Sequence, residues 1–217
     1  MRPMEGIEVD EAASRTPLFS GELNRVFGGG LVKGSVVLCA GEPGIGKSTL
    51  FMQIASNIAS RTSSSNSASV RAPVVYVSGE ENSDQIVSRA RRLHLPTANI
   101  LLHCEIEVEQ IINSIVDLPN KPALVVVDSV QTMYTAGCTG SAGSVTQIRE
   151  STARFIQLAK TYDIAVILLG HVTKSGDVAG PRVLEHMVDT VLFMEGSESE
   201  DHRIVRTMKN RYVCMYM

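Results

Sequence analysis

The sequence has 217 residues, and its 44% hydrophobic and 20% charged residues are typical of a soluble globular protein with a substantial core. Its 20 basic and 23 acidic residues give a net charge of −3, which excludes a globally basic surface, so any nucleic-acid binding must come from local patches or from several subunits together. The four cysteines form no C-x-x-C pair and no apolar run reaches about 18 residues, which argues against a zinc site, a disulfide framework and a membrane span.

Apolar runs alternate with amphipathic stretches along the chain. Residues 1–17 are expected to be flexible, and a short amphipathic segment then ends at Gly28-Gly29-Gly30, a sequence that suits a helix stop. We expect strands at 35–40, 74–78, 99–103, 123–128 and 164–170, a hairpin of 190–194 and 203–208, and helices at 47–60, 82–95, 106–118, 147–162 and 183–188. Polar segments rich in Ser or Gly, expected to be surface loops, lie at 61–72, 134–146 and 172–181. This order predicts an α/β fold, a mostly parallel sheet flanked by helices with a C-terminal hairpin.

One segment fits the phosphate-loop pattern G-x-x-x-x-G-K-[ST] at every fixed position, and it lies between an expected strand and an expected helix. The residues expected to contact the phosphates are Gly41, Glu42, Pro43, Gly44, Ile45, Gly46, Lys47, Ser48 and Thr49. Glycines let consecutive backbone N–H groups face a phosphate, and the helix that follows adds the positive end of its dipole. Lys47 can reach the β- and γ-phosphates, and the Ser48 hydroxyl can ligate Mg²⁺. The sequence therefore predicts binding of a nucleoside triphosphate.

Acidic residues follow two other expected strands. Asp128 ends an apolar run, where phosphate-loop proteins place a carboxylate that holds Mg²⁺ together with the loop hydroxyl, here Ser48. Glu80 follows the strand after the phosphate-loop helix, so its carboxylate can face the γ-phosphate and orient water. Glu81 is the main competitor for that role, and both acids could instead be solvated side chains favoured at a helix start.

Three further residues could take part in catalysis. His171 ends another expected core strand, where it could sense the γ-phosphate by a hydrogen bond and move the loop that follows. Lys209 and Arg211 follow the last strand and could reach a neighbouring subunit's γ-phosphate, as an arginine finger does. The alternative for these two cations is a solvated tail.

At this point the sequence closely resembles one family, the RadA/Sms DNA-repair ATPases, which are relatives of RecA. The matching segments are the lead-in at 21–35, Gly44-Ile-Gly-Lys-Ser-Thr-Leu, Tyr76-Val-Ser-Gly-Glu-Glu, Asp128-Ser-Val-Gln-Thr, Gly170-His-Val-Thr-Lys, Ala179-Gly-Pro-Arg-Val-Leu-Glu-His-Met-Val-Asp and Lys209-Asn-Arg-Tyr. The resemblance implies a RecA-like P-loop NTPase core over residues 18–212, between the flexible segment 1–17 and a tail, 213–217, outside the family pattern.

The resemblance also implies an activity and partners. Such proteins use ATP and Mg²⁺, assemble into homo-oligomeric rings, usually hexamers, and act on single-stranded DNA and recombination intermediates, where they promote branch migration. It assigns water activation to Glu80 and a role in trans to Lys209 and Arg211. It makes the polar loops at 134–146 and 172–181 candidates for DNA contact. Arg149, Lys174 and Arg182 then become candidate phosphate contacts, although each could be an ordinary surface charge.

Several departures from the family pattern accompany the matches. No four-cysteine zinc module precedes the core, no Lon-protease-like domain follows it, and Val213 stands where the family has glycine. These departures suggest a truncated product that binds ATP·Mg²⁺ but hydrolyses it weakly and assembles poorly. The long Ser-rich segment fits a plant or algal source, which implies a chloroplast or a mitochondrion, whereas a bacterial protein would be cytoplasmic.

Two other functions stay open on these residues. One is a RecA-core ATPase or kinase of the clock-protein type, which acts on protein and is indifferent to DNA. The other is an ATP-binding regulator without turnover, which acts through the ring of a full-length relative.

Overall fold

The computed structural model describes residues 14–64, 72–171, 184–196 and 202–213 of the chain. Its strands are β1 (Arg15–Thr16), β2 (Leu31–Val32), β3 (Val36–Gly41), β4 (Val74–Ser78), β5 (Ile100–His103), β6 (Leu124–Asp128), β7 (Ala165–His171), β8 (Thr190–Gly196) and β9 (Arg203–Asn210). Its helices are α1 (Gly21–Phe27), α2 (Lys47–Ser64), α3 (Ser83–Arg92), α4 (Val108–Val116) and α5 (Val145–Tyr162). Each strand and helix expected between residues 35 and 171 is present, with ends that differ by a few residues.

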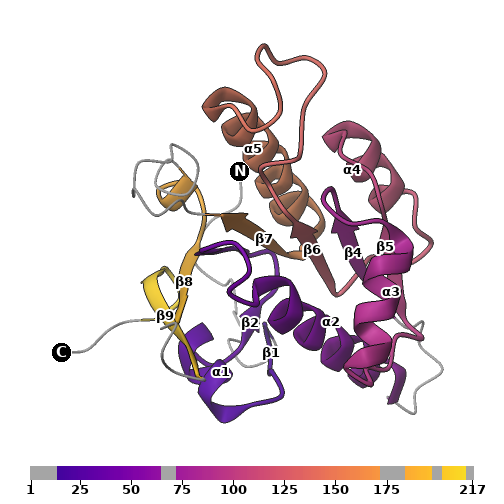
Figure 1. Ribbon diagram of the computed structural model, residues 1–217, viewed down its shortest axis with the longest axis vertical. Helices are drawn as coiled ribbons and strands as arrows, with labels where there is room; N and C mark the ends of the chain where they lie inside the picture. The colour runs from indigo at the N-terminus through magenta and orange to yellow at the C-terminus, as the bar shows by residue number, and fades with distance from the viewer. Residues whose placement is uncertain (1–13, 65–71, 172–183, 197–201, 214–217) are drawn as a thin grey trace, which may run out of the picture.

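A seven-stranded sheet forms the centre of the fold, in the order β5-β4-β6-β7-β3-β8-β9 (Figure 1). Every neighbouring pair is parallel except β8 and β9, which form the expected antiparallel hairpin. The predicted α/β class with a C-terminal hairpin is therefore confirmed. The phosphate-loop strand, β3, lies inside the sheet, bonded to β7 on one side and to β8 on the other.

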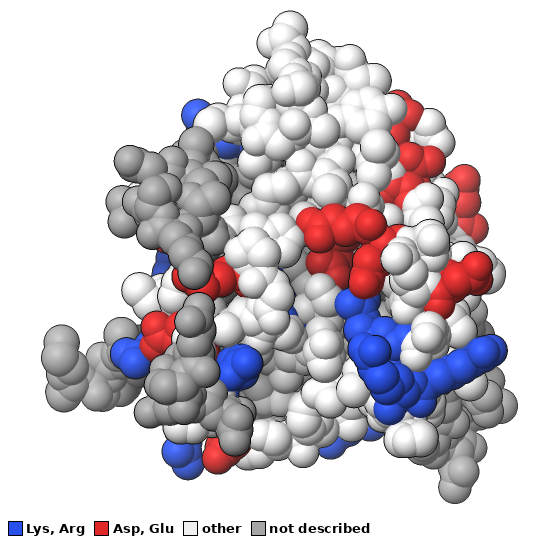
Figure 2. Space-filling model, viewed as in Figure 1, with Lys and Arg blue, Asp and Glu red and all other residues white. Residues whose placement is uncertain are grey.

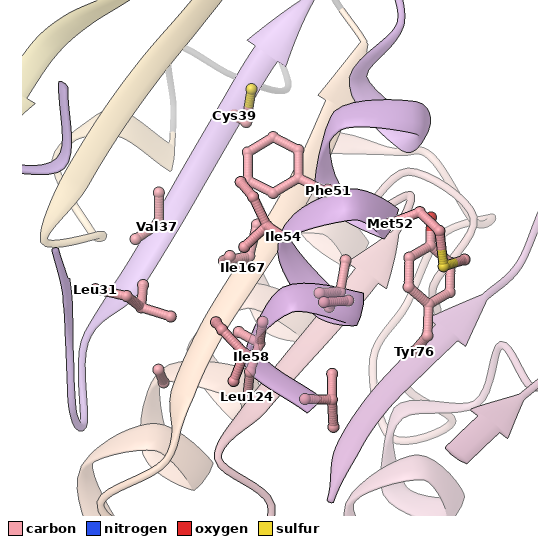
Figure 3. Packing of buried hydrophobic residues seen from close by; sticks show 14 of the residues in the cluster. Leu31, Val37, Cys39, Phe51, Met52, Ile54, Ile58, Tyr76, Leu124 and Ile167 are labelled. Carbon is pink, nitrogen blue, oxygen red and sulfur yellow. The ribbon is translucent and has the colours of Figure 1, made fainter. Parts of the chain in front are cut away.

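Helices cover both faces of the sheet, and the alternation of side chains along each strand divides the core between them. On one face, Leu124 and Val126 of β6 pack with α1, α2 and α3; on the other, Val125 and Val127 pack with α4 and α5. Figure 3 shows the first of these layers, in which Phe51 and Ile54 of α2 lie over the sheet. Because β6 is fully buried on both faces, it has the continuous apolar sequence of an inner parallel strand.

Local signals explain several element boundaries. Gly28 ends α1 in the left-handed conformation, with a φ of 74°, as the Gly-Gly-Gly sequence predicts. Asn82 begins α3 through a capping box with Gln85. Of the short helix expected at 183–188, residues 184–188 are described; 184–185 are helical and 186–188 form a turn and a bend.

Helix α5 begins two residues earlier than expected because Ser144 caps it, so the predicted loop at 134–146 includes its first residues. The side chain of Gln147 in this first turn is 2% exposed and turns inward. It accepts a hydrogen bond from the backbone N–H of Thr135 at 2.8 Å and donates to the carbonyls of Thr135, Cys138 and Gly140 at 3.2, 2.8 and 3.2 Å. One glutamine thus holds the backbone of the preceding loop.

None of the helices in the described ranges has both the length and the apolar character needed to cross a membrane.

Candidate nucleotide-binding site

The carboxyl ends of four parallel strands bring the predicted site residues to one edge of the sheet. Gly41 at the end of β3 lies opposite His171 at the end of β7. Ser78 at the end of β4 lies opposite Asp128 at the end of β6. Ligands bind at this edge in open parallel sheets, so the register itself collects the phosphate loop, Glu80, Asp128 and His171 in one place.

The phosphate loop has the conformation that its glycines predict. Gly44 and Gly46 have φ angles of 77° and 107°, a region that other residues rarely adopt. A Cβ atom at Gly44 would meet no atom within 4 Å, so glycine is needed there for its backbone conformation and not for space. Helix α2 starts at Lys47, directly after the loop, and Glu42, Pro43 and Gly44 are exposed to an incoming ligand.

Lys47 lies at the centre of the site and is 3% exposed. Its ammonium donates hydrogen bonds to the carbonyls of Gly41 and Glu42, both at 2.8 Å, and lies 3.2 Å from Nδ1 of His171. An ammonium has three N–H groups, and these three partners use all of them. An incoming phosphate must therefore replace at least one of these partners.

Nearby carboxylates partly offset the burial of Lys47. Burial lowers the pKa of Lys47, and the carboxylates of Asp128 and Glu80 act in the opposite direction without cancelling this effect. The Cys39 thiol is completely buried in β3, and burial raises its pKa to about 12, so it is uncharged at neutral pH and acts as a small hydrophobic side chain.

Glu80 is held by two partners. Its Oε1 atom lies 2.9 Å from Nε2 of His171 and accepts a hydrogen bond from the Ser129 hydroxyl. The hydrogen bond from His171 lowers the pKa of Glu80 to about 2, with a further contribution from Ser129, while burial opposes the shift. Glu80 is therefore an ionised hydrogen-bond acceptor at neutral pH, which suits orientation of water better than strong basicity.

His171 links Lys47 to Glu80 and has its tautomer assigned by these partners. Because Nδ1 faces an ammonium, it acts as an acceptor, so Nε2 carries the proton and donates it to the Glu80 carboxylate. Its backbone carbonyl accepts a hydrogen bond from the Gln131 amide at 3.1 Å. His171 thus contacts both candidate catalytic side chains and the segment after β6.

The two competing acids that follow β4 point to different partners. Glu81 forms an ion pair with Arg89 of α3, and its backbone N–H donates to the Ser78 hydroxyl at 3.1 Å. Glu81 is thereby part of the start and packing of α3, while Glu80 faces Lys47 and His171. The sequence pattern leaves the two acids equivalent, and the structure separates them.

Asp128 and Ser48 supply oxygen ligands of the kind that Mg²⁺ prefers. Asp128 is 5% exposed and shares its face of β6 with Leu124 and Val126, the face that α2 covers. Ser48 is half-buried in the first turn of α2. Within the described residues no group of three or more His, Cys, Asp or Glu could enclose a metal ion, so the shell of an ion here must be completed by phosphate and water.

Lys209 and Arg211 lie at the opposite ends of these strands. Asn210 of β9 pairs with Thr190 at the start of β8, and Thr190 pairs with Val37 of β3, so these cations are roughly 13 Å along the strand from Gly41. The Lys209 ammonium donates to the carbonyls of Glu185 and Val188 at 2.7 and 2.9 Å. Their predicted action on the nucleotide of a neighbouring subunit stays a prediction.

Arg211 also bonds within its own chain. It donates to the Asp189 carboxylate at 3.3 Å and to the carbonyl of His186 at 3.1 Å. Asp189 accepts further hydrogen bonds from Lys160 at 2.7 Å and from the backbone N–H of Val36 at 2.9 Å. Burial opposes ionisation of Asp189, and the bonds from Lys160 and Val36 outweigh it and lower the pKa of the carboxyl.

The candidate DNA contacts are less completely placed. Arg149 is exposed in the first turns of α5, beside the loop after β6, while Lys174 and Arg182 lie outside the described residues. Figure 2 shows basic side chains gathered beside acidic ones on one face of the molecule, over α3, whose last turn carries Arg89, Arg91 and Arg92. The helix dipole alone can explain arginines in the last turn of a helix, so the sequence did not lead us to expect a basic patch there.

Sequence reasoning missed the supporting residues Ser129, Gln131 and Tyr76. The first two contact Glu80 and His171, and Tyr76 donates a hydrogen bond to Asp128 at 2.7 Å. All three lie within the segments that carry the family resemblance, Tyr76-Val-Ser-Gly-Glu-Glu and Asp128-Ser-Val-Gln-Thr. Their position within these matching segments is the one signal by which the sequence could have identified them.

Comparison with known proteins identifies the family of the chain. A family model described as an AAA domain matches residues 10–177. The DNA repair protein RadA of Bacillus subtilis is 46% identical over 210 residues, which are 97% of this chain and 43% of that protein. The DNA repair protein RadA of Pseudomonas aeruginosa is 47% identical over 193 residues, which are 89% of this chain and 40% of that protein.

A third relative, the DNA repair protein RadA of Streptococcus pyogenes serotype M1, is 44% identical over 212 residues, or 97% of this chain and 44% of that protein. The chain thus spans less than half the length of these relatives. The AAA match and the identity over nearly the whole chain agree with the predicted RecA-like core. The chain therefore belongs to the RadA/Sms family and carries an AAA domain with a RecA-like ATPase fold.

Proposed function

We propose that this chain is the ATP-hydrolysing core of a DNA-repair protein and that single-stranded DNA stimulates its turnover during branch migration. The observation that carries the proposal is the contact chain from Lys47 through His171 to Glu80 at the mouth of the phosphate loop. Relatives named DNA repair protein RadA support the choice of DNA as the partner.

The residues divide the work of hydrolysis. The phosphate loop binds the triphosphate, Lys47 exchanges a loop carbonyl or His171 for a phosphate oxygen, and the ionised Glu80 orients the attacking water. Mg²⁺, held by Ser48 and Asp128, would neutralise charge on the β- and γ-phosphates. Lys209 and Arg211 of an adjacent subunit would stabilise the charge that develops during phosphoryl transfer.

His171 would report the nucleotide state. When Lys47 turns to phosphate, His171 loses one of its two side-chain partners, and its backbone remains bonded to Gln131. This rearrangement shifts the conformational preference of the two segments that carry Gln131 and His171. These segments lead to the two candidate DNA loops, at 134–146 and 172–181. Arg149, Lys174 and Arg182 would contact DNA phosphates there, and a hexameric ring would repeat these few cations around the strand. Action on DNA implies a compartment that holds it: the cytoplasm of a bacterium, or the chloroplast or mitochondrion of a plant.

The test is the ATPase rate with and without single-stranded DNA across a salt series. We expect DNA to raise the rate, and the stimulation to fall steeply as salt increases, because phosphate contacts release counterions. Turnover that DNA does not change, accompanied by phosphorylation of the protein itself, would favour a clock-type kinase. ATP binding without any turnover would favour a regulator.

A further inference from the structure

Asp128, the candidate metal ligand, has a buried partner on the neighbouring strand. Tyr76 of β4 pairs with Val126 of β6. Asp128 lies two residues after Val126, so the side chains of Tyr76 and Asp128 are on the same face of the sheet. The Tyr76 side chain is 0% exposed, and its hydroxyl donates to Oδ2 of Asp128 at 2.7 Å. Figure 3 shows its ring beside Met52 of α2, which packs over these strands.

The bond distinguishes the two oxygens of the carboxylate. Oδ2 accepts from Tyr76, while Oδ1 accepts no hydrogen bond from any residue in the described part of the chain. A carboxylate without such a bond can exchange its oxygens by rotation about the Cβ–Cγ bond. The phenol ring cannot follow that rotation, because it is completely buried in the same core cluster as Met52 and Val126.

From this geometry we propose that Tyr76 is a positioning residue for magnesium, because its hydroxyl holds Oδ2 of Asp128 and leaves Oδ1 to face the ion. The inference rests on the proposed nucleotide site and adds a residue that does not touch nucleotide. Donors behind a ligating carboxylate fix its orientation before the ion arrives, and their loss typically weakens metal affinity roughly tenfold to a hundredfold.

The test compares Tyr76→Phe with the unchanged chain in binding of a fluorescent ATP analogue. Affinity is measured first in EDTA and then across a magnesium titration. We expect Tyr76→Phe to leave the EDTA affinity unchanged and to raise the magnesium concentration at half-maximal effect about tenfold. Tyr162→Phe is the matched control, because it removes a hydroxyl from a half-buried tyrosine at the end of α5, away from the site.

A double-mutant cycle distinguishes a loss of orientation of the Asp128 carboxylate from a general loosening of the fold. In an Asp128→Ala background, Tyr76→Phe should cause no further change in the magnesium requirement, because the hydroxyl has no carboxylate to hold. Should Tyr76→Phe fold poorly, Tyr76→Met fills most of the same space without a hydroxyl and carries the same expectation.

Three results would overturn the role of Tyr76: an unchanged magnesium requirement, an equal loss of affinity with and without magnesium, or the same shift in the Asp128→Ala background. Each of these leaves the proposed function standing. If the unchanged chain fails to bind the analogue at all, the proposed function falls and this role falls with it.

Discussion

The two ends of strand β3 carry similar residues in different arrangements. At its carboxyl end, Lys47 contacts backbone carbonyls and, through His171, the carboxylate of Glu80. At its amino end, Lys209 and Arg211 contact backbone carbonyls, and Arg211 contacts Asp189. Both ends combine basic and acidic side chains with backbone carbonyls.

The acids show how the two ends differ. The Asp189 side chain is 7% exposed and receives hydrogen bonds from a lysine, an arginine and a backbone N–H, so it is fully satisfied by its own chain. The Glu80 side chain is 39% exposed, beside a loop whose glycine backbone is open to a phosphate. Similar residue types thus make a structural cluster where the acid is enclosed, and a ligand site where it faces an open cradle.

The largest expected effect is that of Lys47→Ala on ATP affinity. Removing the ammonium deletes charge-assisted hydrogen bonds to the phosphates, so we expect a loss of about 3 kcal/mol or more, at least a hundredfold. Binding of a fluorescent ATP analogue measures it. Lys160→Ala, which removes the lysine that holds Asp189 at the other end, should leave ATP affinity unchanged, and an equal loss in both variants would contradict the comparison.

The next effect is on turnover. Glu80→Gln keeps the shape of the side chain but removes the charge that orients water, so we expect kcat to fall roughly 100- to 1,000-fold with unchanged ATP affinity. The matched variant Glu81→Gln breaks the ion pair with Arg89 of α3 and should change kcat less than about threefold, since Glu81 contacts neither Lys47 nor His171. A greater loss of kcat in Glu81→Gln than in Glu80→Gln would show that Glu81, and not Glu80, orients the water.

A moderate effect on stability is expected at the other end of β3. Asp189→Asn leaves the half-exposed cations of Lys160 and Arg211 and the buried N–H of Val36 without a charged acceptor, so the free energy of unfolding should fall by about 1–3 kcal/mol. Urea unfolding measures this, with Asp117→Asn as a control at an exposed aspartate. ATP affinity should stay the same, and its loss would show that the two ends are coupled.

The smallest effect concerns acid pH. Because hydrogen bonds lower the pKa of Glu80 from about 4.5 unfolded to about 2 folded, ionised Glu80 stabilises the fold above pH 4.5, and this contribution is lost as pH falls toward 2. Glu80→Gln lacks that term, so its stability should decline less than that of the unchanged chain between pH 4.5 and pH 2. Urea midpoints across this range measure the difference, and parallel curves for the two proteins would contradict the lowered pKa.

The sequence predicts much of this site because its residues end strands. An apolar run leads to each of Gly41, Asp128 and His171, and parallel strands bring such ends to one edge. The order of strands in the sheet could not be predicted, since it depends on which helices pack on which face. For the same reason the sequence could not separate Glu80 from Glu81, or show that Tyr76 reaches Asp128.

The contacts of Lys209 and Arg211 within their own chain could not be predicted from the sequence either. They join the end of β9 to the segment before β8, 21 to 25 residues earlier in the sequence, through bonds to backbone carbonyls. Backbone carbonyls leave no mark in a sequence pattern, because every residue has one. The pattern could therefore identify the cations but not their partners.

Gln147 has a thermodynamic consequence for recognition. Its four hydrogen bonds fix the course of the chain between Thr135 and Gly140 without any bound molecule. A partner that settles on this loop therefore meets a surface whose ordering entropy was already lost when the protein folded, and more of the contact energy becomes affinity. The rigidity also favours partners whose shape already matches, since the loop has little freedom to adjust to others.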